Sequence, residues 1–111
     1  MWNHKVIEKL SRQQKKFIAF ALRCLKSSGV LVYSTCTHAP EENEEIIDFA
    51  LKNFPVQVQT LNLPLKCKQG ITNWNTKQFS NELKKTCRIY PQDNDSEGFF
   101  VAKLTLLDEI K

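Results

Sequence analysis

Glycine is scarce in this chain, and the few glycines stand far apart. Among 111 residues there are 3 glycines, namely Gly29, Gly70 and Gly98. Loops that hold a nucleotide-like ligand against the backbone use closely spaced glycines, because a side chain would prevent the close approach. The chain therefore offers no Gly-rich stretch of its own for such a ligand.

Membrane and metal signals are also missing. No apolar run approaches the roughly 18 residues of a membrane span, and residues 1–11 lack the apolar core of a signal peptide. We therefore expect a cytoplasmic protein without a membrane partner. The 4 cysteines form no CxxC pair and only 2 histidines accompany them, so we expect no metal site. We expect reduced thiols, most of them buried, and Cys24 in the core.

The size and charge of the chain set wide bounds on its function. A length of 111 residues suits one small domain. The net charge of +4 permits an acidic partner such as RNA without requiring one, because an ordinary solvated surface explains it equally well.

The first part of the chain predicts a helix followed by a strand. Ser11 and Gln14 form a capping-box pattern before residues 17–25, which are apolar almost all round. Gly29 fits a left-handed end of this helix. Residues 30–34 (Val-Leu-Val-Tyr-Ser) are a continuous β-rich run, typical of a strand buried on both faces in a parallel sheet.

The remainder predicts a second helix and two more strands. Pro40 fits the first position of a helix whose apolar stripe ends before Pro55. Alternating residues predict a strand over 56–63, and a last strand is expected over 99–106. The polar stretch between them has room for a short helix near residues 80–85. A helical crossover between strands implies an α/β layout.

Two short motifs together form a specific pattern: Tyr-Ser-Thr-Cys-Thr at residues 33–37 and Pro-Glu-Glu-Asn-Glu at residues 40–44. With them, the chain resembles the Sun/Fmu-type RNA 5-methylcytosine methyltransferases from about Trp2 to Leu106. Further similar residues are Gln14, Gly70, Ile71, Trp74, residues 88–91 (Arg-Ile-Tyr-Pro) and residues 98–102 (Gly-Phe-Phe-Val-Ala).

The resemblance implies a partial Rossmann-like class I methyltransferase fold. Residues 1–111 would be a single partial domain, the C-terminal part of the catalytic domain, with the last three strands, the final one antiparallel, and two main helices. The family's S-adenosylmethionine loop and its upstream Asp-Ala-Pro-Cys segment are absent. We therefore expect S-adenosylmethionine in the complete enzyme and no binding by this chain alone. The upstream strand that would pair with residues 30–34 is absent, so we expect an open edge there. Both helices should cover one face of the sheet and leave the other face bare.

The resemblance also implies a chemical role for Cys36. In this family the matching cysteine adds to carbon 6 of cytosine, which makes carbon 5 electron-rich enough to accept a methyl group. The position of Cys36 agrees with that role, because ligands bind beyond the carboxyl ends of strands in open α/β sheets. Cys36 also precedes the helix expected at Pro40, whose N-terminus favours a thiolate.

Neighbouring residues have supporting or open roles. We expect Thr35, Thr37 and Asn43 to support the cysteine loop, and the acidic residues 41–45 to stabilise a helix start. Arg88 would either meet RNA phosphate or form a structural ion pair, and Lys84 and Lys85 are candidate RNA contacts.

Two functions follow from these features. The chain would carry the nucleophile of a tRNA or rRNA cytosine-5 methyltransferase, completed by an N-terminal half in cis or in trans, or it would self-associate. The alternative is a non-catalytic truncated homologue that binds RNA or protein.

Overall fold

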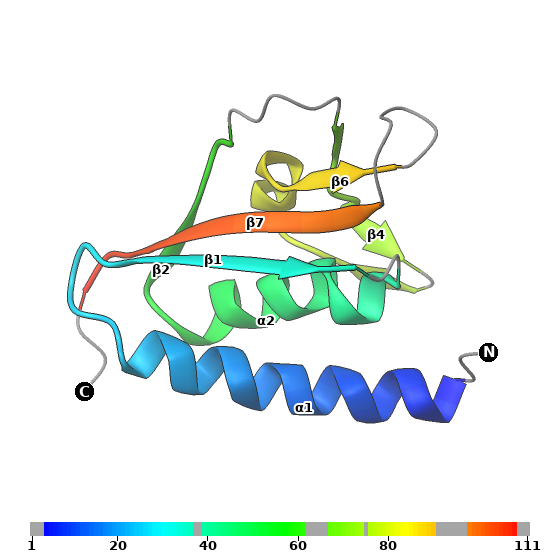
Figure 1. Ribbon diagram of the computed structural model, residues 1–111, viewed down its shortest axis with the longest axis horizontal. Coiled ribbons are helices and arrows are strands. Elements are labelled where there is room, and N and C mark those ends of the chain that lie inside the picture. Colours follow the sequence, from blue (N-terminus) through cyan, green and yellow to red (C-terminus); the bar gives the residue numbers. More distant parts are fainter. Residues whose placement is uncertain (1–3, 37–38, 62–66, 75, 91–97, 109–111) are drawn as a thin grey trace.

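The computed structural model describes residues 4–36, 39–61, 67–74, 76–90 and 98–108 (Figure 1). Its helical segments are α1 (His4–Arg23), η1 (Pro40–Glu42), α2 (Glu44–Asn53) and η2 (Asn81–Lys85), where η marks a 3-10 helix. Its strands are β1 (Val30–Thr35), β2 (Val56–Gln59), β3 (Lys68–Gln69), β4 (Asn73–Trp74), β5 (Lys77–Gln78), β6 (Cys87–Ile89) and β7 (Phe99–Leu106).

Strand β7 organises the main sheet. It pairs antiparallel with β1 from Val30↔Thr105 to Thr35↔Phe100. Strands β2 and β6 pair with β7 over stretches that are also paired with β1. Each must therefore lie along the edge of β7 opposite to β1. Because β1 and β2 are each antiparallel to β7, they run in the same direction. This arrangement confirms the expected α/β fold with two main helices and an antiparallel final strand.

The two main helices cover one face of the sheet. Figure 1 shows α1 running beside α2 on the same side of the strands. Ile18 and Leu22 of α1 and Ile46 and Ile47 of α2 are buried in one core cluster, together with alternate β7 residues Phe100, Ala102, Leu104 and Leu106. Each such aliphatic side chain contributes about 1.5–3 kcal/mol by leaving water. Among the described residues no helix is long and apolar enough to cross a membrane.

Helix α1 begins earlier than the capping-box pattern predicted. Ser11 lies inside it, and its hydroxyl donates to Glu45 Oε2 at 2.9 Å instead of capping a helix end. The predicted cap was wrong because a carboxylate on α2 offers the hydroxyl a tertiary partner. Only one side of the apolar stretch is buried against the rest of the fold, because Phe17 and Phe20 are 74% and 68% exposed.

The turn into β1 corrects two further expectations. Ser28, with φ 69°, occupies the left-handed region, and Gly29 does not. A glycine at position 29 avoids a steric clash, because a Cβ there would lie 2.8 Å from the Lys26 carbonyl oxygen. Burial of β1 on both faces was also wrong for the described residues: Val30 and Val32 are 47% and 58% exposed, since only the opposite face meets the helices.

The second helix starts later than Pro40. Pro40 opens η1, and Asn43 has non-helical angles (φ −119°, ψ −91°) that separate η1 from α2. The predicted apolar stripe is confirmed, with Ile46, Ile47 and Ala50 buried.

The polar stretch contains more sheet than its sequence indicated. The strand predicted over 56–63 is shorter, because β2 ends at Gln59, and residues 62–63 of the prediction lie outside the described residues. The expected short helix is η2, with the Ser80 hydroxyl accepting from the Glu82 amide at 3.2 Å. Strand β6 was not predicted, because its three residues carry no readable period and are ordered by pairing with β3 and β7.

Candidate functional site: the loop after β1

Cys36 is an exposed cysteine immediately after the last residue of β1. Thr37, a predicted supporting residue, lies outside the described residues. Cys24 and Cys67 are also exposed, and Cys87 alone of the four is buried. The expectation that most thiols are buried, with Cys24 in the core, was therefore wrong. Cys24 lies just beyond the end of α1, past the stripe that faces the sheet.

The residue before Cys36 is held by a buried side chain. The Thr35 hydroxyl donates to Asn43 Oδ1 at 2.5 Å, and Asn43 is fully buried between η1 and α2. A buried amide oxygen without a partner would cost about 1–3 kcal/mol, so this contact fixes the end of β1 against the start of α2. The backbone that carries Cys36 thus leaves the sheet from an anchored point.

A second contact holds the middle of β1. The Tyr33 hydroxyl donates to the Glu42 backbone oxygen at 2.8 Å and also contacts the Gln14 side-chain oxygen. The Gln14 amide nitrogen in turn donates to Glu42 Oε1 at 3.2 Å. Burial, and to a lesser degree the Glu42 carboxylate, raises the pKa of Tyr33 above its ordinary value, so the hydroxyl keeps its proton. Three elements, α1, β1 and η1, therefore meet at this phenol.

The last residue of the Pro-Glu-Glu-Asn-Glu motif forms a buried ion pair. Arg88 Nε and Nη2 bind Glu44 Oε2 and Oε1 at 2.5 and 2.6 Å, and the Ile71 amide donates to Glu44 Oε2 at 2.9 Å. Glu44 is 0% exposed and Arg88 5%. Of the two roles left open for Arg88, the structure shows the ion pair. Two carboxylates of the acidic run, Glu42 and Glu44, are buried.

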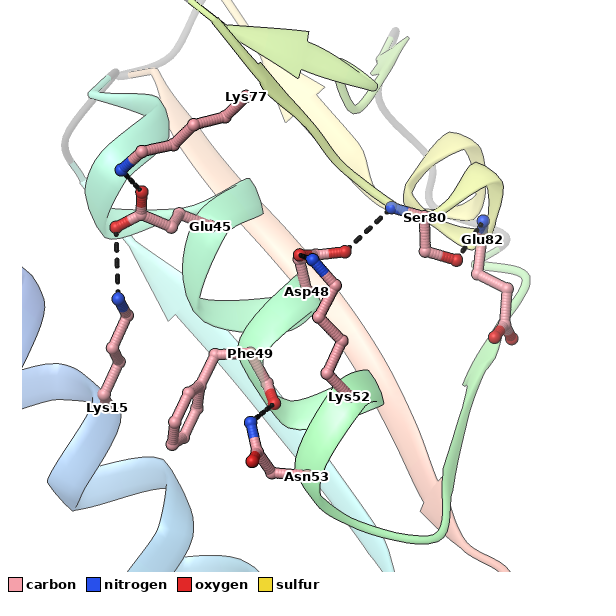
Figure 2. A network of polar contacts seen from close by, with 9 residues as sticks. All are labelled: Lys15, Glu45, Asp48, Phe49, Lys52, Asn53, Lys77, Ser80 and Glu82. Atoms are coloured by element: carbon pink, nitrogen blue, oxygen red, sulfur yellow. Dashed lines mark hydrogen bonds and ion pairs between the residues drawn. The ribbon is translucent and has the colours of Figure 1, made fainter.

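Helix α2 also joins the polar region to α1 (Figure 2). Glu45 accepts hydrogen bonds from Ser11 and Lys77 and lies 3.4 Å from Lys15 Nζ. Burial alone would raise the pKa of Glu45, but the hydrogen bonds from Lys77 and Ser11 and the charge of Lys15 outweigh it and lower that pKa.

One turn further along α2, a buried carboxylate holds the start of η2. Asp48 accepts from the Ser80 amide at 2.8 Å, and Lys52 Nζ lies 2.7 Å from its other oxygen, as Figure 2 shows. Glu45 and Asp48 together position the segment from β5 to η2.

The candidate RNA contacts do not form one surface. Lys84 and Lys85 are exposed in the last turn of η2, whereas Arg88 is buried under the sheet. Within the described residues no group of three or more His, Cys, Asp or Glu side chains is placed to hold a metal ion.

An apolar groove that sequence reasoning missed runs along β1 toward the cysteine. It has a volume of about 340 Å³ and lies between Gln14, Phe17 and Ile18 of α1 and the strand from Leu31 to Thr35. Among the described residues β1 pairs with β7 alone, so the groove borders an open strand edge. The exposed phenylalanines of α1 were the available signal, but their exposure is visible only in three dimensions.

Two solved structures share this fold. The chain superposes on a methyltransferase homologue from Pyrococcus horikoshii with a TM-score of 0.86 and 36% identity, covering 96% of this chain and 34% of that one. It also matches NSun6 from Pyrococcus horikoshii, with a TM-score of 0.76 and 31% identity, covering 98% of this chain and 25% of that one. The fold of this chain is that of part of a methyltransferase structure.

The sequence identifies the family within that class. Residues 2–105 match the family model of the 16S rRNA methyltransferase RsmB/F, and the chain belongs to this family. It is similar to the tRNA (cytosine(49)-C(5))-methyltransferase of Pyrococcus abyssi, with 48% identity over 94 residues, 85% of this chain and 30% of the relative. It is also similar to the 28S rRNA (cytosine-C(5))-methyltransferase of Mus musculus, with 33% identity, 91% of this chain and 13% of the relative. The chain thus spans a third or less of these relatives.

Proposed function

We propose that this chain is the nucleophile-bearing part of an RNA cytosine-C5 methyltransferase acting on tRNA or rRNA. The observation that carries the proposal is the placement of Cys36. Its thiol is exposed at the end of β1, one residue beyond the Thr35–Asn43 contact, in a chain of the RsmB/F family. Relatives from an archaeon and a mammal are cytosine-C5 methyltransferases of tRNA and rRNA.

Cys36 supplies covalent catalysis in this proposal. Its thiolate attacks carbon 6 of a cytosine, and the added electron density makes carbon 5 nucleophilic. The base must be unstacked to be reached, which suits a nucleophile on an exposed loop better than one within the core. Thr35, Tyr33 and Asn43 act as positioning residues, because they fix β1 against η1 and α2 without reaching the base.

The residues of this chain do not fit S-adenosylmethionine. Gly29 and Gly70 serve packing: an added Cβ would lie 2.8 Å from the Lys26 carbonyl oxygen at one and 2.0 Å from Thr86 Oγ1 at the other. Neither glycine opens a helix as a cofactor loop does. We infer that the methyl donor is held by residues outside these 111.

The open edge of β1 is the place for those residues to pack. Val32 of β1 and Phe17 of α1 line the groove beside this edge, and both are exposed. Unpaired strand edges next to apolar surface favour a further strand. An N-terminal half, joined in cis or supplied in trans, would cover this surface, and self-association is the other way to cover it.

The test is a chimera with a relative. The segment of the Pyrococcus abyssi enzyme that matches at 48% identity is replaced by this chain. The chimera receives S-adenosylmethionine and tRNA containing 5-fluorocytosine, whose fluorine stops the reaction at the covalent stage. We expect an adduct on denaturing gels and its loss in Cys36→Ser. The matched control is Cys24→Ser, which removes another exposed cysteine and should retain the adduct.

The possible results separate the two functions. An adduct that persists in Cys36→Ser would contradict the assignment of the nucleophile. A chimera that binds tRNA yet forms no adduct with Cys36 intact would favour the alternative, a non-catalytic RNA- or protein-binding module. For that module the exposed lysines Lys84 and Lys85 are the first residues to replace.

A further inference from the structure

A pair of cysteines lies at the junction of β3 and β6, away from the Cys36 loop. In the antiparallel register Gln69 pairs with Cys87 and Lys68 with Arg88. Cys67 precedes Gln69 by two residues and therefore projects to the same side as Gln69. The two sulfur atoms, Cys67 Sγ and Cys87 Sγ, are 3.1 Å apart. No motif noted in the sequence joins these two residues, which are 20 positions apart.

The two thiols have unequal surroundings. Cys67 is exposed, and Cys87, the first residue of β6, is 5% exposed. Burial first, and then the contact with Cys67, raises the pKa of Cys87 to about 12. A dissolved oxidant therefore meets Cys67 before Cys87, while the buried sulfur stays next to whatever bond Cys67 forms.

We propose that Cys67 and Cys87 form a reversible disulfide by exchange with a small-molecule disulfide. The Cys67 thiolate attacks one sulfur of the oxidant, forming a mixed disulfide and releasing one small thiolate. Cys87 then gives its proton to solvent and attacks the Cys67 sulfur, which expels the second small thiolate. Two protein thiols are oxidised and one small disulfide is reduced to two thiols.

The cross-link would stabilise the segment that supports the site. It would join residue 67 to residue 87 and so close a loop containing β3, β4, β5 and η2. The next residue, Arg88, binds Glu44 at the start of α2. Closing a loop restricts the unfolded chain, so the oxidised protein should unfold at a higher temperature than the reduced one. The expected rise in Tm is about 5 °C or more.

The experiment compares oxidised and reduced forms of the 111-residue chain. The protein is incubated with oxidised glutathione, its remaining thiols are alkylated, and peptides are mapped by mass spectrometry without reduction. We expect a linked peptide pair containing Cys67 and Cys87, reversed by dithiothreitol. Cys24→Ser should form the same link. Cys67→Ser should form none, leave Cys87 unmodified and lose the oxidation-dependent rise in Tm.

Three results would overturn the proposal. The first is a stable glutathione adduct on Cys67 that Cys87 never displaces. The second is a preferred link between any other pair, such as Cys24 with Cys36. The third is a rise in Tm on oxidation that persists in Cys67→Ser. A parallel reaction in urea shows whether the selectivity comes from the fold, because the unfolded chain should link its cysteines without this preference.

Discussion

Removing one partner of the Glu44–Arg88 ion pair should destabilise the fold more than any surface change. Glu44→Gln keeps the size of the side chain and its acceptor for the Ile71 amide, but it removes the negative charge that pairs with the buried Arg88 guanidinium. Arg88→Met leaves the converse problem, a carboxylate that is 0% exposed and holds one backbone amide. Both changes act on the same pair from opposite sides.

The expected loss follows from the burial of both groups. Breaking a buried pair by removing one partner costs about 3–5 kcal/mol, because the remaining charge stays desolvated. A domain of this size has a total stability of roughly 5–15 kcal/mol, so either variant should lose a large share of it. The double variant Glu44→Leu with Arg88→Met should recover most of the loss, since no buried charge remains. Arg88→Lys should fall between, because it replaces two hydrogen bonds by one.

Urea unfolding followed by circular dichroism measures these free energies. The matched control is Lys77→Gln, which also removes a cation from a glutamate, but at a lysine side chain that is 58% exposed. The control should cost less than about 1 kcal/mol. If Glu44→Gln and Lys77→Gln lost equal amounts, burial would not determine the strength of the pair. If the double variant lost the sum of the losses of Glu44→Leu and Arg88→Met measured singly, the two side chains would not be coupled.

Three further predictions concern the Thr35–Asn43 hydrogen bond, the stability at low pH and the open edge of β1. Thr35→Val should cost about 1–3 kcal/mol in urea unfolding by removing the hydroxyl that donates to the buried Asn43 oxygen, and Thr35→Ser, which keeps the hydroxyl, should cost less. The lowered pKa of Glu45 adds stability that is present above its ordinary pKa of 4.5 and is lost as pH falls through the lower folded value. Thermal scans of Glu45→Gln should therefore show a smaller loss of stability below that pH than the parent, and equal slopes would contradict the assignment. Val32→Lys should leave stability within about 0.5 kcal/mol, because Val32 is 58% exposed. It should also reduce any self-association seen by sedimentation velocity, and unchanged association would place the contact elsewhere.

Local sequence signals predicted the elements whose burial pattern is simple. The stripe of α2 and its end before Pro55 were readable because Ile46, Ile47 and Ala50 all meet the same sheet face. The last strand was readable because Phe100, Ala102, Leu104 and Leu106 alternate toward one core. Strand β6 was not predicted, because its three residues are ordered by pairing with the distant strands β3 and β7.

The role of each polar motif residue depended on contacts that no spacing reveals. Ser11 was predicted to cap a helix and is hydrogen-bonded to α2. The acidic run was predicted to stabilise a helix start, and it contains Glu44, which is fully buried. From the sequence, Arg88 could have bound either an RNA phosphate or a carboxylate. The fold brings it to Glu44, which lies 44 residues away in the sequence, and so shows the carboxylate as its partner. A side-chain hydrogen bond between distant residues has no local signature in sequence.

The sequence by itself determined the α/β class, the family resemblance and the position of Cys36 after a strand, because periodicity and adjacent residues encode these features. The tertiary structure decided which face of each element is covered, which carboxylates are buried with partners, and that Cys67 and Cys87 lie in contact. The physical reason is that burial and electrostatic pairing are properties of residues brought together from distant positions. Their free energies are set by the three-dimensional surroundings, which a linear pattern does not contain.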